Sequence, residues 1–287
     1  MKRRDFLKTS FTGATAFALS GLTLMIPRRS AAATTVEVDL VAEGDFKTMA
    51  DGTSVYVWQF RDLAGSGPGA LTSGLLAQEG DTVNVTVENH LDRPINFVIP
   101  GVLPTSTAIS PGSYRTYSYT APSAGSYMYY DDANGRIGRA MGLSGPMVVM
   151  PSDGSRALYA GGPAFDRQYT LVLNELDDRL NQAIYSGQSF DMANYEPNYF
   201  FANGLSYPET AKNGDTLIAM GVGEDVAIRF INTGMIVSPM HFHGYHVNAI
   251  SRNRVPETAV IEKDTVLVDI DECVDVIVPV NQPGTFP

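Results

Sequence analysis

Apolar and polar positions alternate along much of this chain. Residues 82–87 read Thr-Val-Asn-Val-Thr-Val, and residues 226–230 combine Val, Ala, Ile and Phe with one Arg. A period of two predicts strands with one buried face. The 27 glycines and 17 prolines supply turn residues at short intervals. Helical periodicity is weak and favours only one short helix, at residues 175–184. The pattern predicts an all-β fold, a sandwich or a barrel.

The chain resembles itself at a fixed distance. Residues 79–89 resemble residues 223–232, and aligning their final asparagines gives an offset of 143 positions that runs without a gap to Gly244. A later block, residues 109–127, resembles residues 268–286. Such a repeat indicates two copies of one β domain.

We therefore expect two domains, at residues 34–155 and 165–287, joined where Pro, Gly, Ser and Asp cluster. The first copy continues for a further stretch to Met150 after the block that ends the second copy at Pro287. Judged by ordinary strand lengths, the second domain is expected to lack about one and a half strands. A domain without its last strand would expose a sheet edge.

Residues 1–33 have the order of an export signal. Residues 2–8 read Lys-Arg-Arg-Asp-Phe-Leu-Lys, residues 11–26 are largely apolar, and residues 31–33 are alanines. Basic, apolar and small-residue regions in this order predict a cleaved twin-arginine signal, and hence a periplasmic or extracellular location. A retained membrane helix is the alternative, but the apolar stretch is short and rich in Gly, Ser and Thr.

The net charge of the chain limits the classes of partner that it is expected to bind. Without residues 1–33 the net charge changes from −11 to −16, because six basic and one acidic side chain are lost. A surface this acidic argues against nucleic acid and against anionic membranes as partners. A single cysteine, Cys273, excludes an intrachain disulfide.

Three of the four histidines lie in residues 238–246, which read Ser-Pro-Met-His-Phe-His-Gly-Tyr-His. On a strand His241 and His243 would point to the same face, and two imidazoles on one face can bind one transition-metal ion, or one each of an adjacent pair. His246 would point to the other face unless a bulge at Gly244 redirects it. The motif predicts a metal site at His241 and His243, with His246 as a further candidate.

The repeat aligns this motif with a stretch that has no metal-ligating side chains. The offset of 143 places Val98 against His241 and Pro100 against His243. The first domain is therefore expected to hold no metal ligand there. His90, the fourth histidine, lies in a turn and is expected to be structural.

Several short stretches together resemble the plastocyanin-like domains of the multicopper oxidase family, over most of the chain from about Gly74 onward. Residues 201–208, for example, read Phe-Ala-Asn-Gly-Leu-Ser-Tyr-Pro. The other stretches are residues 79–83, 109–112, 143–146, 213–215, 238–246 and 282–287. The resemblance implies two cupredoxin-like Greek-key β-sandwich domains and copper as cofactor.

The ligands that the resemblance implies are only partly present. The family's strand reads His-Pro-x-His-x-His-Gly, where the first His binds blue copper and the next two bind a trinuclear cluster. Ser238 stands at the first position, and His241 and His243 stand at the other two. The His-x-His pairs of the family's opening domain are replaced at residues 98–100 and, roughly, at residues 130–132.

The remaining family ligands follow the Pro-Gly-Thr-Phe-Pro turn at which this chain ends, and Cys273 lies on the preceding strand. Met240, close to the histidines, is either a soft ligand or core packing. Asp131 and Asp132, at replaced ligand positions, have either a hard-metal or substrate role or lie in a solvated turn.

A full trinuclear cluster needs eight imidazoles, and the chain has four histidines. The chain alone is therefore not expected to perform laccase chemistry. It would hold one copper through His241 and His243 with water or a carboxylate, or complete a site with a missing segment or a second subunit.

Three functions remain open. The first is an exported multicopper-oxidase-type oxidoreductase that couples oxidation of small substrates, phenols or metal ions, to dioxygen. The second is a non-catalytic copper-binding protein, and the third is a SufI-like pseudo-oxidase scaffold for protein interactions. The expected partners are a small-molecule or metal-ion substrate and a homo-oligomer that completes the site, with no nucleic acid, and no membrane after signal cleavage.

Overall fold

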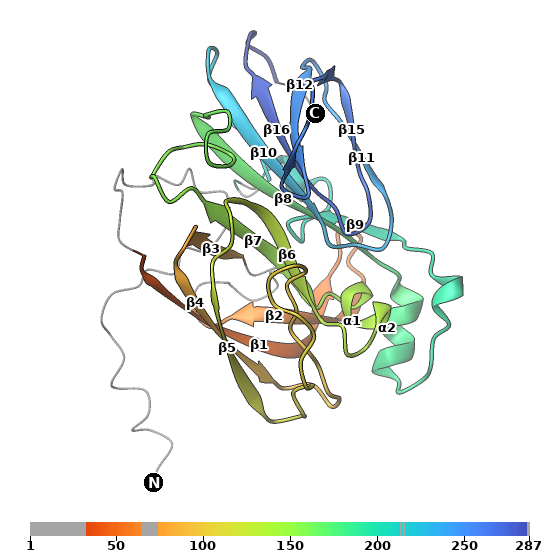
Figure 1. The fold of residues 1–287 in the computed structure, drawn as a ribbon. Helices are drawn as coiled ribbons and strands as arrows, with labels where there is room; N and C mark the ends of the chain where they lie inside the picture. Colours follow the sequence, from red (N-terminus) through yellow and green to blue (C-terminus); the bar gives the residue numbers. More distant parts are fainter. Residues whose placement is uncertain (1–32, 65–73, 213, 215, 286–287) are drawn as a thin grey trace.

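The computed structural model describes residues 33–64, 74–212, 214 and 216–285. The predicted export signal therefore lies outside the described residues, apart from Ala33. Strands dominate the rest, so the predicted all-β fold is confirmed (Figure 1). Among the described residues, no helix has the length and hydrophobicity that a membrane crossing requires.

The first half of the chain forms two sheets. One has the strand order β2-β1-β4-β5 and the other the order β3-β7-β6. Their strands are β1 (Thr35–Thr48), β2 (Ser54–Asp62), β3 (Leu75–Gln78), β4 (Thr82–Asn89), β5 (Tyr114–Thr120), β6 (Gly125–Tyr130) and β7 (Ser144–Met150). A short helix, α1 (Arg136–Ala140), connects β6 to β7. Phe60, Val85 and Tyr129 are fully buried in the core between the sheets.

The second half repeats the larger sheet and extends it. Its strand order is β13-β12-β16-β10-β8-β9, with β14 also paired to β12, while β11 and β15 form a separate pair. The strands are β8 (Arg167–Leu176), β9 (Tyr199–Ala202), β10 (Asp225–Asn232), β11 (Ser238–His241), β12 (Val247–Arg252), β13 (Val255–Pro256), β14 (Glu262–Lys263), β15 (Thr265–Val268) and β16 (Cys273–Pro279).

The one predicted helix is present as α2 (Asp178–Tyr185). It begins three residues later than predicted, because β8 continues to Leu176. The Asp177 carboxylate caps it by accepting a hydrogen bond from the Arg179 backbone N–H. Two 3₁₀ turns follow, η2 (Met192–Asn194) and η3 (Glu209–Ala211).

The two halves share one strand register. Thr82 pairs with Thr120 between β4 and β5, and Asp225 pairs with Pro279 between β10 and β16. These pairs are related by the offset of 143 on the first strand and by one of 159 on the second. The sequence repeat is therefore a repeat of strand pairing.

The same bonds recur at the ends of the paired strands. Asn89 is buried and donates from Nδ2 to the carbonyl of Ile109, and Asn232 does the same to the carbonyl of Val268. In the described sheets no strand of one half pairs with a strand of the other. The domain bounds inferred from the sequence, 34–155 and 165–287, stay a prediction.

The halves differ in their second layer. In the first half this layer holds β3, β7 and β6, whereas among the described residues of the second half it holds β11 and β15. The second half also has β12, β13 and β14 between Gly244 and β15, without a counterpart among the described strands of the first half. Among the described residues, the layer that carries the histidines therefore has two strands, against three in the first half.

The β6–β7 layer of the first half packs against β10, β12 and β16 of the second (Figure 1). Apolar side chains such as Met150 and Ile277 share one cluster there. Arg229 is fully buried beside Asp275, at 3.5 Å, and the Ser126 hydroxyl of the first half donates to Asp275 at 2.5 Å. A buried charge needs such partners, so this network binds the two halves together.

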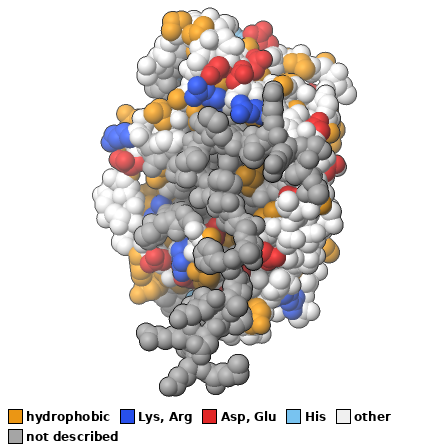
Figure 2. All heavy atoms as spheres, turned by 90° about the vertical axis from the view of Figure 1, so that its left-hand side faces the viewer, with side chains coloured by type: hydrophobic (Ala, Val, Ile, Leu, Met, Phe, Trp, Pro, Cys, Tyr) orange, Lys and Arg blue, Asp and Glu red, His pale blue; other side chains and the backbone are white. Residues whose placement is uncertain are grey.

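Surface charges are mixed on the face shown in Figure 2. Lys and Arg side chains lie there singly or in pairs, next to Asp and Glu, among the atoms drawn in colour. Apolar side chains are scattered between them.

Candidate metal centre

Side chains alternate along β11 and just past its end, and this exposes His241 and His243 to solvent. Met240 and Phe242 pack against the core of the second half, while His241 and His243 are exposed. The alternation continues past the end of β11 because the Phe242 N–H donates to the carbonyl of Asp264 at 2.8 Å. The structure therefore places the two predicted ligands on one face, as the period of two requires.

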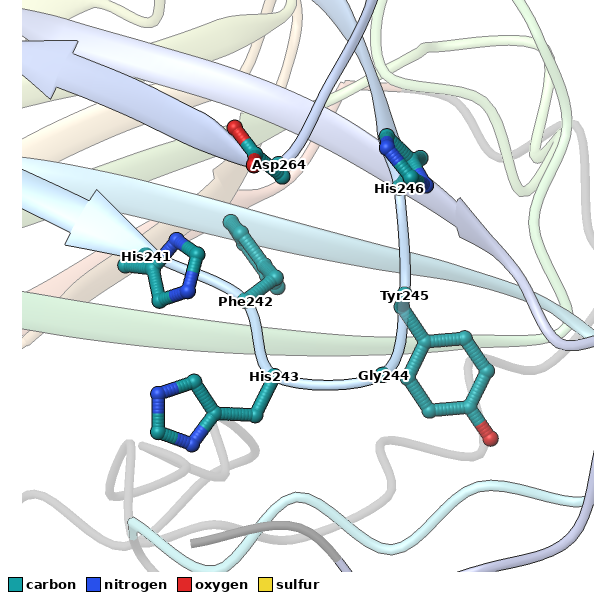
Figure 3. A pocket seen from close by; sticks show the side chains of 7 residues that line it. All are labelled: His241, Phe242, His243, Gly244, Tyr245, His246 and Asp264. Carbon is teal, nitrogen blue, oxygen red and sulfur yellow. The ribbon is translucent and has the colours of Figure 1, made fainter.

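The two imidazoles form the candidate site. Their ring centroids are 5.0 Å apart and their planes are inclined by 70°. Figure 3 shows both rings on the same arm of the loop. Both line an open pocket with a volume of about 450 Å³, together with Phe242, Gly244, Tyr245, His246 and Asp264. Among the residues that the structure describes, no Lys or Arg side chain lines this pocket to oppose a bound cation.

The third candidate, His246, lies on the other arm of the turn (Figure 3). Gly244 has φ 76°, a left-handed conformation that glycine adopts readily, and it turns the chain between β11 and β12. Tyr245 follows with a buried ring whose hydroxyl donates to the carbonyl of Gln282 at 2.6 Å. The structure thus brings His241 and His243 together and leaves His246 apart, so its role as a ligand stays a prediction.

Carboxylates do not complete the site within the described part of the chain. Asp264 faces the pocket, but no group of three or more His, Cys, Asp or Glu side chains there is arranged to hold a metal ion. The described residues therefore provide a two-histidine donor set.

A residue that the sequence did not single out completes the local geometry. Thr265 lies directly opposite His241 in the antiparallel pair β11–β15, and its Oγ1 is 3.0 Å from Nδ1 of His241. This partner depends on strand register. The register follows from the repeat only once β12, β13 and β14 are known to be inserted, so sequence reasoning missed it.

The equivalent stretch in the first half is buried at residues 95–99. Val98 stands at the position of His241 and is 5% exposed, with backbone hydrogen bonds in both directions to Tyr130. The Tyr130 ring lies 4.8 Å from the Arg139 guanidinium, which donates to the carbonyls of Thr233 and Gly234 in the second half. Apolar packing and a contact between the halves thus occupy the place of the absent ligands.

The side chain of Asp131 is buried, although we expected it in a solvated turn. Its side chain is fully buried and accepts hydrogen bonds from the backbone N–H groups of Asn96, at 2.7 Å, and Ala133, at 3.1 Å. Burial raises the pKa of the Asp131 carboxyl, although these donors oppose the shift. The turn itself is largely exposed at residues 132–136, as expected, but it is organised around the buried carboxyl of Asp131.

The other side chains that could ligate a metal are held by local contacts or by burial. His90 Nε2 lies 2.9 Å from the Glu88 carboxylate, in the turn after β4. Cys273 is buried on β16, where burial raises the pKa of its thiol far above the ordinary value. Met240 packs inward, away from the histidine rings. Within the described residues, none of these side chains extends the histidine pair.

Comparison with known proteins identifies the family. Two family models, each described as multicopper oxidase, match residues 64–154 and 183–287, about two thirds of the chain together. Laccase-3 of Thanatephorus cucumeris is 26% identical over 246 residues, which are 77% of this chain and 41% of the laccase. A copper-containing nitrite reductase of Neisseria meningitidis serogroup B is 27% identical over 210 residues, covering 69% of this chain and 50% of that enzyme. This chain thus spans half or less of the length of these two relatives.

Solved structures agree on the fold. Blue copper oxidase from Nitrosomonas europaea superposes with a TM-score of 0.73 at 24% identity, over 88% of this chain and 77% of that one. A copper nitrite reductase from Nitrosomonas europaea gives 0.66 at 22% identity, over 86% and 85%. The two regions matched by the family models show that this chain belongs to the multicopper oxidase family of copper proteins.

Proposed function

We propose that this protein is an exported, copper-binding oxidoreductase of the multicopper oxidase type, in which His241 and His243 bind copper. The observation that carries the proposal is the pair of exposed imidazoles, 5.0 Å apart at the end of β11, in a chain of this family. Oxidation of a small molecule or metal ion, coupled to dioxygen, is the activity proposed for the completed site.

The donor set suits copper. Imidazole nitrogen is a favoured ligand of copper in proteins, and both rings are open to solvent in a pocket without basic side chains. When bound, copper supplies one-electron redox chemistry. The chain itself holds the two rings at the end of β11 and anchors the strand through Met240 and Phe242 in the core.

Two imidazoles are only part of a ligand set. The remaining positions are proposed to be filled by water or a carboxylate, or by donors from a further segment or a second copy of the chain in a homo-oligomer. A blue copper is not part of the proposal, because such a site needs a thiolate. Cys273 is buried, and Ser238 stands where a further histidine would be required.

A second candidate function is a copper-binding or scaffold role without turnover. It is favoured by the first half, where Val98 and the buried Asp131 replace donors and the positions are closed by packing. A catalytic copper cluster between the halves would need donors on both sides. The periplasmic or extracellular location belongs to both candidate functions and rests on the signal inferred for residues 1–33.

The test is a copper titration of the protein without residues 1–33. We expect one or two copper ions by metal analysis, an EPR signal of nitrogen-ligated Cu(II), and no intense thiolate-to-copper absorption. His241→Ala combined with His243→Ala should abolish binding, whereas His90→Ala, the matched control, should leave it unchanged. Retention of copper by the double variant would refute the site.

Oxygen consumption with a phenol or a metal ion then separates the two functions. Copper-dependent turnover that disappears in the double variant supports the oxidoreductase. Stoichiometric copper binding without turnover supports the binding or scaffold role.

A further inference from the structure

The hydrogen bond between His241 and Thr265 makes the two candidate ligands unequal. Within the described residues, His241 has a side-chain partner on its Nδ1, at 3.0 Å, whereas His243 has only the ring contact with His241. The two residues of the bond face each other across β11 and β15, where opposed side chains are close enough to interact. His241 is the anchored member of the pair.

Thr265 is itself held firmly. Its neighbour Val266 is fully buried in the core, and its other neighbour, Asp264, accepts a backbone hydrogen bond from Phe242 at 2.8 Å. The β-branched side chain of threonine also restricts χ1 on a strand. The hydroxyl therefore stands at a fixed place beside the imidazole.

The chemistry of imidazole gives this contact a consequence. A neutral imidazole carries its proton on one nitrogen and keeps a lone pair on the other, and only the nitrogen with the lone pair can bind a metal. A threonine hydroxyl can accept a hydrogen bond, so Thr265 can retain the proton on Nδ1 of His241. Nε2 is then free for copper. Hydrogen bonding to the second ring nitrogen is a general means of orienting a histidine ligand.

The first half supports this assignment by contrast. Ser106 stands at the position of Thr265 when Ile109 is set against Val268. Its hydroxyl donates to the Asn96 side chain at 3.1 Å and accepts from Arg115 at 2.9 Å. A hydroxyl thus stands at this position in both halves, but only in the second does it bond to a histidine.

We propose that Thr265 is a positioning residue of the copper site, which fixes His241 with Nε2 free and makes it the leading ligand, while His243 adapts to the ion. This proposal rests on the copper site proposed above. It adds to the family's histidine motif a residue outside that motif.

Two variants isolate the hydroxyl. Thr265→Val keeps the branched shape and the strand preference but removes the oxygen, and Thr265→Ser restores a hydroxyl. Thr116→Val is the matched control, because it removes an exposed threonine hydroxyl that bonds across strands to Thr86, at 3.0 Å, in the first half.

The first measurement needs no copper. Nitrogen-15 NMR of the histidines, at a pH where imidazole is neutral, reports which ring nitrogen carries the proton. The His241 signal is assigned by its loss in His241→Ala. We expect the Nδ1-protonated form in the wild type, in Thr265→Ser and in Thr116→Val, and a shift toward the Nε2-protonated form in Thr265→Val.

The second measurement is the affinity for Cu(II) at fixed pH. We expect binding by Thr265→Val to be about 10-fold weaker, the lower end of the effect of losing such a partner. Thr265→Ser and Thr116→Val should match the wild type. An unchanged tautomer or an unchanged affinity in Thr265→Val would each overturn the positioning role. Copper binding that survives His241→Ala with His243→Ala would instead overturn the proposed site, so the two failures are distinguishable.

Discussion

Two equivalent stretches of this protein, residues 95–101 and 238–244, have the same place in the same fold and opposite surroundings. Val98 is 5% exposed beneath contacts from Tyr130, whereas its counterpart His241 is open to solvent. The first stretch is bridged to β6 through Val98 and Tyr130, and the second belongs to a layer of two described strands. The comparison shows that the fold places an equivalent stretch in both halves. The residues that pack against each stretch decide whether a side chain there is exposed and able to bind a ligand.

The burial of the first stretch also explains why an apolar side chain, Val98, stands at the position of His241. A histidine at Val98 would be removed from water with no metal and no designed hydrogen-bond partner, which costs free energy. At His241 the same side chain stays hydrated and has Thr265 beside it. The two copies therefore differ at this position, with a packed valine in one and an exposed histidine in the other.

The largest effect is expected from breaking the buried ion pair of the second half that contacts Ser126 of the first. Arg229→Ala should lower the free energy of unfolding by about 3–5 kcal/mol, because it leaves Asp275 buried without its cation. Urea unfolding of both proteins measures the difference. Arg252→Ala, which removes partly exposed ion pairs with Glu257 and Glu272, should cost about 0–1 kcal/mol. Equal losses in the two variants would contradict a special role for the buried pair.

A reciprocal exchange tests the two stretches directly. Val98→His should destabilise the protein by about 2–4 kcal/mol, through lost packing and a buried imidazole, without creating copper binding. His241→Val should change stability by no more than about 0.5 kcal/mol, because the site is exposed and valine suits a strand. Urea unfolding and copper titration check both. A stable Val98→His variant would show that the covering of the first stretch is looser than the structure indicates.

The smallest effect concerns pH and the buried carboxyl of Asp131. Its pKa is raised in the folded state, so the folded form binds a proton more tightly than the unfolded form does. Its contribution to stability is therefore full below the ordinary carboxyl pKa of about 3.9 and is lost as pH rises through the higher folded pKa. Asp131→Asn cannot titrate, so the wild type should lose stability relative to this variant as pH rises.

Urea unfolding at several pH values measures that slope. The amide fits the ring of backbone donors less well than a carboxyl, which adds a constant offset and leaves the slope as the test. Asp92→Asn, at a side chain 80% exposed, is the control and should keep the slope of the wild type. A wild type that gains stability relative to Asp131→Asn as pH rises would reverse the assigned direction.

Much of the fold was predictable from local pattern. The alternation at residues 82–87 predicted β4, and the repeat predicted two copies of one β domain, with which the equivalent pairing of β4–β5 and β10–β16 agrees. The common face of His241 and His243 followed from strand geometry alone. Helix α2 was predicted with its start displaced, because the strand β8 continues through the position where the helical pattern begins.

Other features were not predictable because they depend on contacts between distant residues. The bond from Thr265 to His241 joins residues 24 positions apart, and it exists only in the register that follows the insertion of β12–β14. The separation of His246 depends on the left-handed turn at Gly244. The buried carboxyl of Asp131 is bonded to the backbone of Asn96, 35 positions earlier in the chain.

The sequence by itself determined the all-β fold, the duplicated strand order and the presence of two imidazoles on one face, since these follow from a period of two and from a repeat. Only the tertiary structure decided which copy is open. Exposure depends on what packs against a segment, and Val98 and His241 lie at equivalent positions of the repeat with different surroundings. The hydroxyl beside His241 was settled in the same way, because side chains far apart along the chain meet only when strands pair.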